Sequence, residues 1–186
     1  DCFDFDGFHS GFPQFLLSDD EQIVATAFSL LEKITPSEDD MNAVFQCLSN
    51  GGDVSLKAMK YLIKNQELWA ENIPSDLYYC LISCVSSLKY NDVGMALALL
   101  IDSLSAPGIE FNPDQIEILS NFLNDRNSAT YVIKAFCIIW DKIQANDDNS
   151  WFIEILQKHD TELEEMASCA DEDVSEVASK LLEILP

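Results

Sequence analysis

The sequence has 186 residues, 48% of them hydrophobic, with 33 acidic against 10 basic residues and a formal net charge of −23. This apolar content is enough for the core of one domain and excludes a disordered acidic tail. The charge excludes nucleic acid and anionic membranes as favoured partners, because both are bound largely through Lys and Arg. It permits a basic or amphipathic peptide or protein as a partner.

The first segment, residues 1–17, holds five of the eleven phenylalanines. Gly7, Gly11 and Pro13 interrupt any continuous helix, so we expect an extended Phe-rich arm. Phenylalanines at this density need a surface to bury against. Two interpretations stay open. The arm either docks on the first helices and covers their open end, or it acts as a linear motif that fills a groove on this or another molecule. The second leaves room for a homodimer formed through the arm.

The first amphipathic helix is expected to open with a capping box from Ser18 to Glu21 and to run to about Ile34. Its spacing places Ile23 and Leu30 on the inward stripe, together with other apolar residues at helical intervals. We therefore expect both side chains to be buried in the core.

Further helix starts follow at polar residues that favour the N-cap or the first turn of a helix. Counting them gives about ten helices of 9–18 residues and no credible strand, which predicts an all-α protein. A connector at residues 66–73 is expected to hold a short helical turn around Trp69. The expected starts are Ser37, Asp53, Ser75, Asn91, Asn112, Asn127, Asn149, Thr161 and Asp171.

The final helix, residues 173–185, serves as the template for a repeated pattern. Four helices each begin their apolar stripe with a valine, at Val54, Val93, Val132 and Val174. Successive valines are 39, 39 and 42 residues apart (93 − 54, 132 − 93 and 174 − 132). Apolar residues follow four and seven positions after each valine, as one face of a helix requires. These residues are Ala58, Leu97, Phe136 and Ala178, then Tyr61, Leu100, Ile139 and Leu181.

A period near 40 residues with two or three helices per unit is typical of armadillo and HEAT repeats. Residues 151–185 resemble an armadillo-type repeat, with a short helix, a second helix, an acidic turn and a longer third helix. The resemblance implies a right-handed α-solenoid of about four repeats, in which residues 18–186 form a single domain. A globular multi-helix bundle is the alternative. Importin-type members read basic targeting peptides with Trp and Asn one helical turn apart, whereas here Gln144 follows Trp140.

The usable surface of a solenoid is the concave ladder formed by its longer helices. Positions five, six and nine residues after each valine lie beside the stripe that the core needs. They are apolar and acidic in the two middle repeats and turn polar in the last. They predict a peptide-binding groove that suits an amphipathic or basic peptide. The alternative is that the same residues pack against neighbouring helices. The candidate groove residues are Met59, Ile63, Leu99, Asp102, Ile138 and Asp141.

No pattern in the sequence predicts catalysis, a metal site or a cofactor. The six cysteines include no C-x-x-C, and Cys80 and Cys84 lie far in sequence from both histidines, which favours reduced, buried thiols. The Asp4-x-Asp6 motif lacks the preceding strand of a phosphatase and the Glu of a calcium loop. We therefore expect a protein that is not an enzyme.

The function expected from these features is a cytoplasmic, non-enzymatic scaffold or adaptor that binds a peptide or protein segment on its concave face. No apolar run is long enough for a membrane span, and no signal peptide is recognised. The alternative is a structural or dimerising repeat module of a larger cytoskeletal or trafficking regulator. A small all-α enzyme is a third, less favoured reading.

Overall fold

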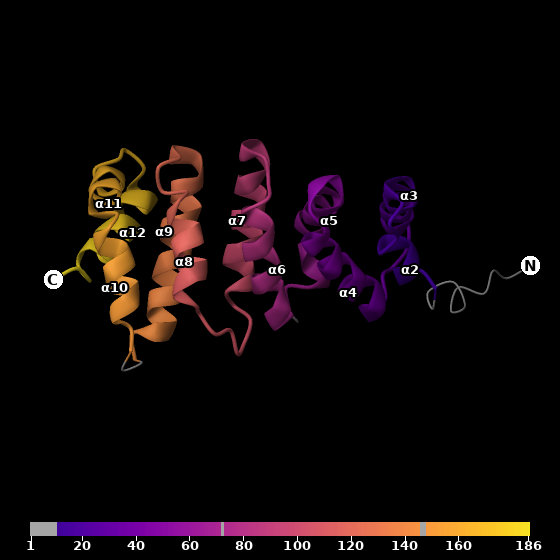
Figure 1. The fold of residues 1–186 in the computed structure, drawn as a ribbon, viewed down its shortest axis with the longest axis horizontal. Coiled ribbons are helices and arrows are strands. Elements are labelled where there is room, and N and C mark those ends of the chain that lie inside the picture. The colour runs from indigo at the N-terminus through magenta and orange to yellow at the C-terminus, as the bar shows by residue number, and fades with distance from the viewer. Residues whose placement is uncertain (1–10, 72, 146–147) are drawn as a thin grey trace, which may run out of the picture. The chain divides into compact units, whose positions relative to one another are not determined.

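The computed structural model describes residues 11–71, 73–145 and 148–186. Within these residues the chain forms eleven α-helices and two short 3-10 helices, without a strand (Figure 1). The all-α prediction is confirmed. The Asp4-x-Asp6 motif and the first ten residues of the expected arm lie outside the described residues.

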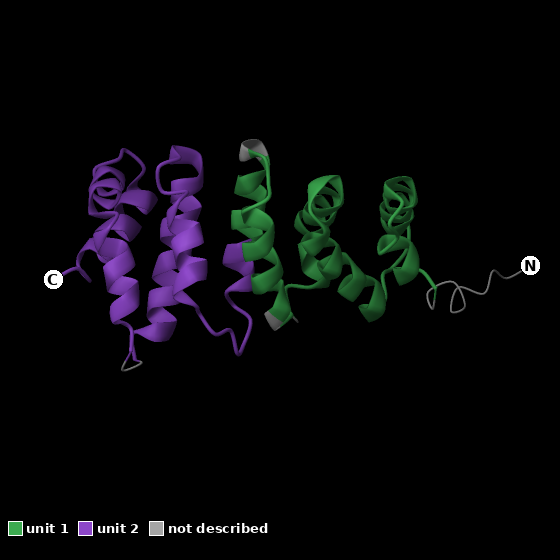
Figure 2. Ribbon diagram, in the orientation of Figure 1, with its two compact units in different colours: residues 1–99 green, residues 100–186 purple. Residues whose placement is uncertain are grey.

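The chain divides into two compact units, residues 1–99 (unit 1) and residues 100–186 (unit 2), shown in Figure 2. The boundary falls inside helix α7, Tyr90–Ser103. Each unit is described by itself below. The expectation of a single repeat domain over residues 18–186, like the solenoid and the armadillo resemblance, stays a prediction.

Unit 1 is built from short helices joined by tight turns. Helix α2 packs against α3 and α4, α3 also packs against α5, and α4 contacts α5 and α6. The 3-10 helix η1 lies against α4, α5 and α6. The elements are α2 (Pro13–Leu16), α3 (Glu21–Leu31), α4 (Glu38–Cys47), η1 (Leu48–Asn50), α5 (Gly52–Lys64), η2 (Gln66–Leu68), α6 (Ser75–Val85) and most of α7.

The described end of the expected arm is helical rather than extended. Pro13 occupies the first position of α2, where its missing N–H leaves no hydrogen bond unmade. Phe12 and Leu16, four residues apart, are fully buried. The Cys47 thiol of α4 donates to the Leu16 carbonyl oxygen at 3.2 Å, which fastens α2 to α4. The turn signals at Gly11 and Pro13 therefore mark the start of a short helix instead of preventing one.

Five expected helix starts hold, at Ser37, Ser75, Asn112, Asn149 and Asp171, and the others move by two residues or fewer. Ser37 and Asp40 form a reciprocal capping box on α4, and Asn112 caps α8. The expected capping box from Ser18 is wrong, because the Ser18 hydroxyl accepts from the Asp20 N–H and Asp20 itself caps α3. Similar shifts replace Asp53 by Gly51 and Asn127 by Asp125.

The shift at α5 has a backbone cause. Gly51 and Gly52 adopt φ of 75° and 58°, which glycine reaches without the strain that a Cβ introduces. The helix can therefore begin at Gly52, and Asp53 falls in its first turn, where the helix dipole favours an acid.

The connector after α5 carries the turn expected around Trp69. The 3-10 helix η2 ends at Leu68, and the buried indole of Trp69 follows directly. Its Nε1–H donates to the Leu62 carbonyl oxygen at 2.9 Å, so the polar edge of the ring is satisfied inside unit 1.

Unit 2 contains the end of α7 and five more helices. Helix α12 packs against α9 and α11, and α10 packs against α8. Phe152 lies within 6 Å of the rings of Phe136, Trp140 and Trp151, which gives the unit an aromatic cluster. The helices are α8 (Pro113–Ser120), α9 (Arg126–Ile143), α10 (Ser150–Gln157), α11 (Asp160–Ala167) and α12 (Glu172–Leu182).

The predicted repeat register agrees with burial inside the two units. All eight residues found four and seven positions after the repeat valines are buried. The expected stripe of the first helix is wrong at two positions, because Ile23 and Leu30 are exposed while Val24 and Phe28 are buried. No helix of the described residues is long and apolar enough to cross a membrane.

Candidate functional site

The six predicted groove residues do not share one environment. Met59 and Leu99 are buried, with 0% and 1% of their surface exposed, which agrees with the alternative that these residues pack against neighbouring helices. Helix α5 is contacted by α3, α4 and η1, and this arc of neighbours covers more of its surface than a single stripe. Only Ile63 remains exposed among the three candidates of unit 1.

The other three candidates belong to unit 2. Asp141 is exposed, and Asp102 and Ile138 are half-buried. Burial raises the pKa of the Asp102 carboxyl. The candidates are divided between the two units, with Met59, Ile63 and Leu99 in unit 1 and Asp102, Ile138 and Asp141 in unit 2. Peptide binding at the remaining positions stays a prediction.

Two cysteines of the described residues, Cys47 and Cys84, are buried, and three others are half-buried. Cys47, Cys80, Cys84, Cys137 and Cys169 are free thiols. Burial raises the pKa of Cys47 to about 11, and burial with the nearby Asp141 carboxylate raises that of Cys137 to about 11. Such thiols hold their protons at neutral pH and are poor nucleophiles and metal ligands. Among the described residues, no group of three His, Cys, Asp or Glu side chains is placed to hold a metal ion.

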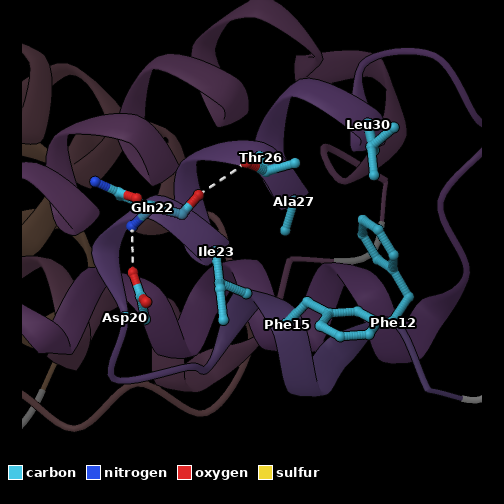
Figure 3. Close-up of a pocket in the computed structure, with 8 residues that line it drawn as sticks. All are labelled: Phe12, Phe15, Asp20, Gln22, Ile23, Thr26, Ala27 and Leu30. Atoms are coloured by element: carbon cyan, nitrogen blue, oxygen red, sulfur yellow. Dashed lines mark hydrogen bonds between the residues drawn. The ribbon is translucent and has the colours of Figure 1, made fainter.

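The strongest candidate site is an open apolar pocket of about 430 Å³ between α2 and α3 in unit 1 (Figure 3). Phe12 and Ala27 are buried and form its floor. Its rim consists of Phe15, Ile23 and Leu30, which are 50%, 41% and 40% exposed. The pocket therefore has a buried apolar floor, and the apolar side chains that surround this floor are partly exposed to solvent.

Helix α2 places the two phenylalanines of the pocket. The Phe15 N–H donates to the Phe12 carbonyl oxygen at 2.9 Å, which closes the first turn. The Phe12 ring points inward, and the Phe15 ring meets it edge to face with centroids 6.4 Å apart. This edge-to-face contact holds Phe15 at the rim although half of it is exposed.

Polar groups line only one edge of the pocket. The Asp20 carboxylate accepts from the Gln22 N–H at 2.8 Å, and the Thr26 hydroxyl donates to the Gln22 carbonyl oxygen at 2.8 Å (Figure 3). These bonds lie within α3 and its cap, so the groups are not arranged as an acid–base pair. The negative charge at this edge is that of the Asp20 carboxylate, which caps α3.

The exposed apolar surface of the described residues gathers around this pocket. Three of their six exposed large hydrophobic side chains, Phe15, Ile23 and Leu30, line it, and the other three are Leu17, Ile63 and Leu68. Single exposed apolar residues are ordinary, but a contiguous group beside a pocket is typical of an interaction site.

Sequence periodicity missed this pocket because α3 is apolar on too many sides. Ile23, Val24, Ala27, Phe28, Leu30 and Leu31 cover more of a helix circumference than α2 and α5 bury. The sequence does show that α3 has more apolar residues than one buried face can hold. It does not show which of these residues stay exposed.

Comparisons with known proteins return no similarity: no family model matches the sequence, and no match was found among curated proteins or solved structures.

Proposed function

We propose that the protein is a non-enzymatic interaction module that binds a segment of another protein at the α2–α3 pocket. The segment is a basic amphipathic helix, whose apolar side chains enter the pocket while its Lys or Arg side chains lie beside the acidic start of α3. An armadillo- or HEAT-like arrangement of the long helices is part of the proposal, and the burial of the repeat positions supports it.

The observation that carries the proposal is the exposed rim formed by Phe15, Ile23 and Leu30 on well-packed helices. Covering apolar surface is favourable by about 25 cal/mol per Å². The buried floor means that a partner would find a preformed surface instead of having to order one. Preformed pockets lose less conformational entropy on binding.

Charge selects the kind of segment. Residues 11–32 contain four acids, Asp19, Asp20, Glu21 and Glu32, and no Lys, Arg or His. Three of these acids lie two to four residues before Ile23 of the rim. A basic segment would gain favourable charge interactions there and from the net charge of −23, whereas an acidic one would be repelled.

A matched pair of substitutions tests the location. Ile23 and Ile63 lie on helices of unit 1 and are 41% and 45% exposed, so Ile23→Asp and Ile63→Asp introduce the same change at similar exposure. The full chain is titrated into a fluorescein-labelled amphipathic helix of Leu and Lys, with a Leu–Glu helix as the charge control, and anisotropy gives Kd.

We expect the Leu–Lys helix to bind at the α2–α3 pocket and the Leu–Glu helix not to bind there, so that Ile23→Asp leaves the anisotropy of the Leu–Glu helix unchanged. Ile23→Asp should weaken binding at least tenfold, about 1.4 kcal/mol, although it adds negative charge. Ile63→Asp should change Kd less than about twofold, well under 1 kcal/mol. Circular dichroism checks that both variants are folded.

Three results would contradict the proposal. Equal effects of the two variants would show that the pocket is not the site, and a loss only in Ile63→Asp would favour the originally predicted groove. A dimer detected by light scattering and abolished by Ile23→Asp would make a second copy of the chain the occupant, as the dimerising alternative requires.

A further inference from the structure

The opposite flank of α3 carries a second groove with different chemistry, outside the proposed docking pocket. It is about 270 Å³ in volume and lies between α3 and α5 within unit 1. Phe28, Ser29 and Glu32 line it from α3, and three lysines line it from α5. The lysines are Lys57, Lys60 and Lys64.

These three lysines share one face of α5 because their positions are i, i+3 and i+7. They are three of only ten basic residues in the chain, and they stand within eight consecutive positions. Positive charge is thus concentrated here, although the protein as a whole has a net charge of −23.

Internal ion pairs do not neutralise all three lysines of this groove. Lys64 pairs with Glu32 at 3.0 Å, but both side chains are largely exposed, and such pairs contribute little. Among the described residues, no carboxylate lies within ion-pair distance of the Lys57 or Lys60 ammonium groups. At least two positive charges of this groove are therefore free to meet an external anion.

The floor between the helices is aromatic. The rings of Phe28 and Tyr61 pack with centroids 6.0 Å apart, and both side chains are nearly buried. Burial, with the Asp40 and Glu32 carboxylates, raises the pKa of Tyr61 to about 12. Tyr61 is therefore uncharged at neutral pH and does not oppose an anion above it.

We propose that the α3–α5 groove binds an Asp- and Glu-rich peptide segment of a partner protein. The carboxylates of the segment lie against Lys57, Lys60 and Lys64, where opposite charges attract at close range. The net negative charge of the molecule opposes an acidic segment in general, so binding is confined to the one groove where local attraction exceeds that repulsion. The two flanks of α3 then select segments of opposite charge.

The test compares two triple variants of equal net charge. Replacing Lys57, Lys60 and Lys64 with Gln changes the net charge from −23 to −26, as does replacing the exposed Lys89, Lys158 and Lys180 (−23 − 3 in each case). The general repulsion is therefore the same in both variants, and only the groove differs. The probe is a fluorescein-labelled peptide of alternating Glu and Asp with one central Phe.

We expect the wild type to bind this probe in 50 mM NaCl and to lose at least tenfold in affinity by 300 mM NaCl, because salt screens exposed charges. The groove variant should bind at least about tenfold more weakly than the wild type, and the control variant less than about twofold more weakly. Surface Lys→Gln changes leave the fold intact, which circular dichroism verifies.

Equal losses in the two variants would overturn the inference, as would a wild type that does not bind the acidic probe. Binding that is lost only in Ile23→Asp would also overturn it, because the probe would then occupy the α2–α3 pocket through its Phe. This last result would leave the proposed function standing, so failure of the two proposals can be told apart.

Discussion

Helices α3 and α12, the first and last long helices of the described chain, differ in what they leave exposed. Each has eleven residues and begins at an aspartate N-cap, Asp20 in α3 and Asp171 in α12. On α12 the exposed side chains are mostly charged, and Lys180 pairs with Glu176 at 2.7 Å. On α3 they include apolar side chains, as described above.

The same two helical positions make the contrast sharper. The third and tenth residues are Ile23 and Leu30 in α3, both exposed, and Val174 and Leu181 in α12, both buried. In α12 these residues face α9 and α11, and the polar residues are left for solvent. The exposed apolar rim is therefore a property of the α3 sequence and not a general consequence of being a terminal helix. We regard this as the best reason to consider the α2–α3 pocket functional.

The largest expected effect concerns the pocket floor. Phe12→Ala should destabilise unit 1 by about 3–5 kcal/mol, because a fully buried ring leaves a cavity between α2, α3 and α4. Leu181→Ala in α12 is the matched core substitution, expected at about 2–5 kcal/mol. Urea denaturation followed by circular dichroism measures both. A loss below about 1 kcal/mol for Phe12→Ala would show that α2 is not an integral part of unit 1, and the pocket would lose its floor.

A smaller loss of stability, similar in size for the two helices, is expected when the N-cap aspartate of α3 or of α12 is replaced. The Asp20 carboxylate accepts from the Gln22 N–H, and the Asp171 carboxylate accepts from the Val174 N–H at 3.2 Å. Asp20→Ala and Asp171→Ala should each cost about 1 kcal/mol, and the Asn variants of both should retain most of the stability. The shift in urea midpoint measures the losses. Markedly unequal losses would mean that the start of α3 is held by something besides its cap.

The smallest change in stability is expected from the rim itself. Replacing both Ile23 and Leu30 with Gln should change stability by less than about 0.5 kcal/mol per site, because neither side chain is needed for the core. The fluorescence of bound anilinonaphthalene sulfonate should nevertheless fall. The control replaces both Glu176 and Lys180 of α12 with Gln, and it should leave the fluorescence of the bound dye unchanged. If the α3 variant were strongly destabilised, the rim would belong to the core and the contrast with α12 would disappear.

Much of the fold was predictable from local chemistry. The helix starts at Ser37 and Asn112 and the short turn before Trp69 followed from capping and turn residues alone. The repeat register was equally visible, since Phe136 and Ile139 are buried as the spacing requires. Such features depend on residues near each other in sequence, where pattern and structure are directly linked.

The candidate site was not predictable in the same way, because burial depends on which elements come together. The spacing places Met59 in a groove, but α5 has neighbours on several sides and buries it. The spacing places Ile23 in the core, but the neighbours of α3 leave it exposed. Helical period gives the angle between two side chains on one helix. It does not give the width of the arc that other helices cover.

The buried indole of Trp69 has a practical consequence. It is the single tryptophan of unit 1, since Trp140 and Trp151 belong to unit 2. Replacing those two with Phe leaves one intrinsic fluorophore, held by its bond to the Leu62 carbonyl oxygen. Emission from that protein then reports the unfolding of unit 1 alone, while circular dichroism reports both units. Comparing the two signals measures whether the halves of the chain unfold together, without any attached dye.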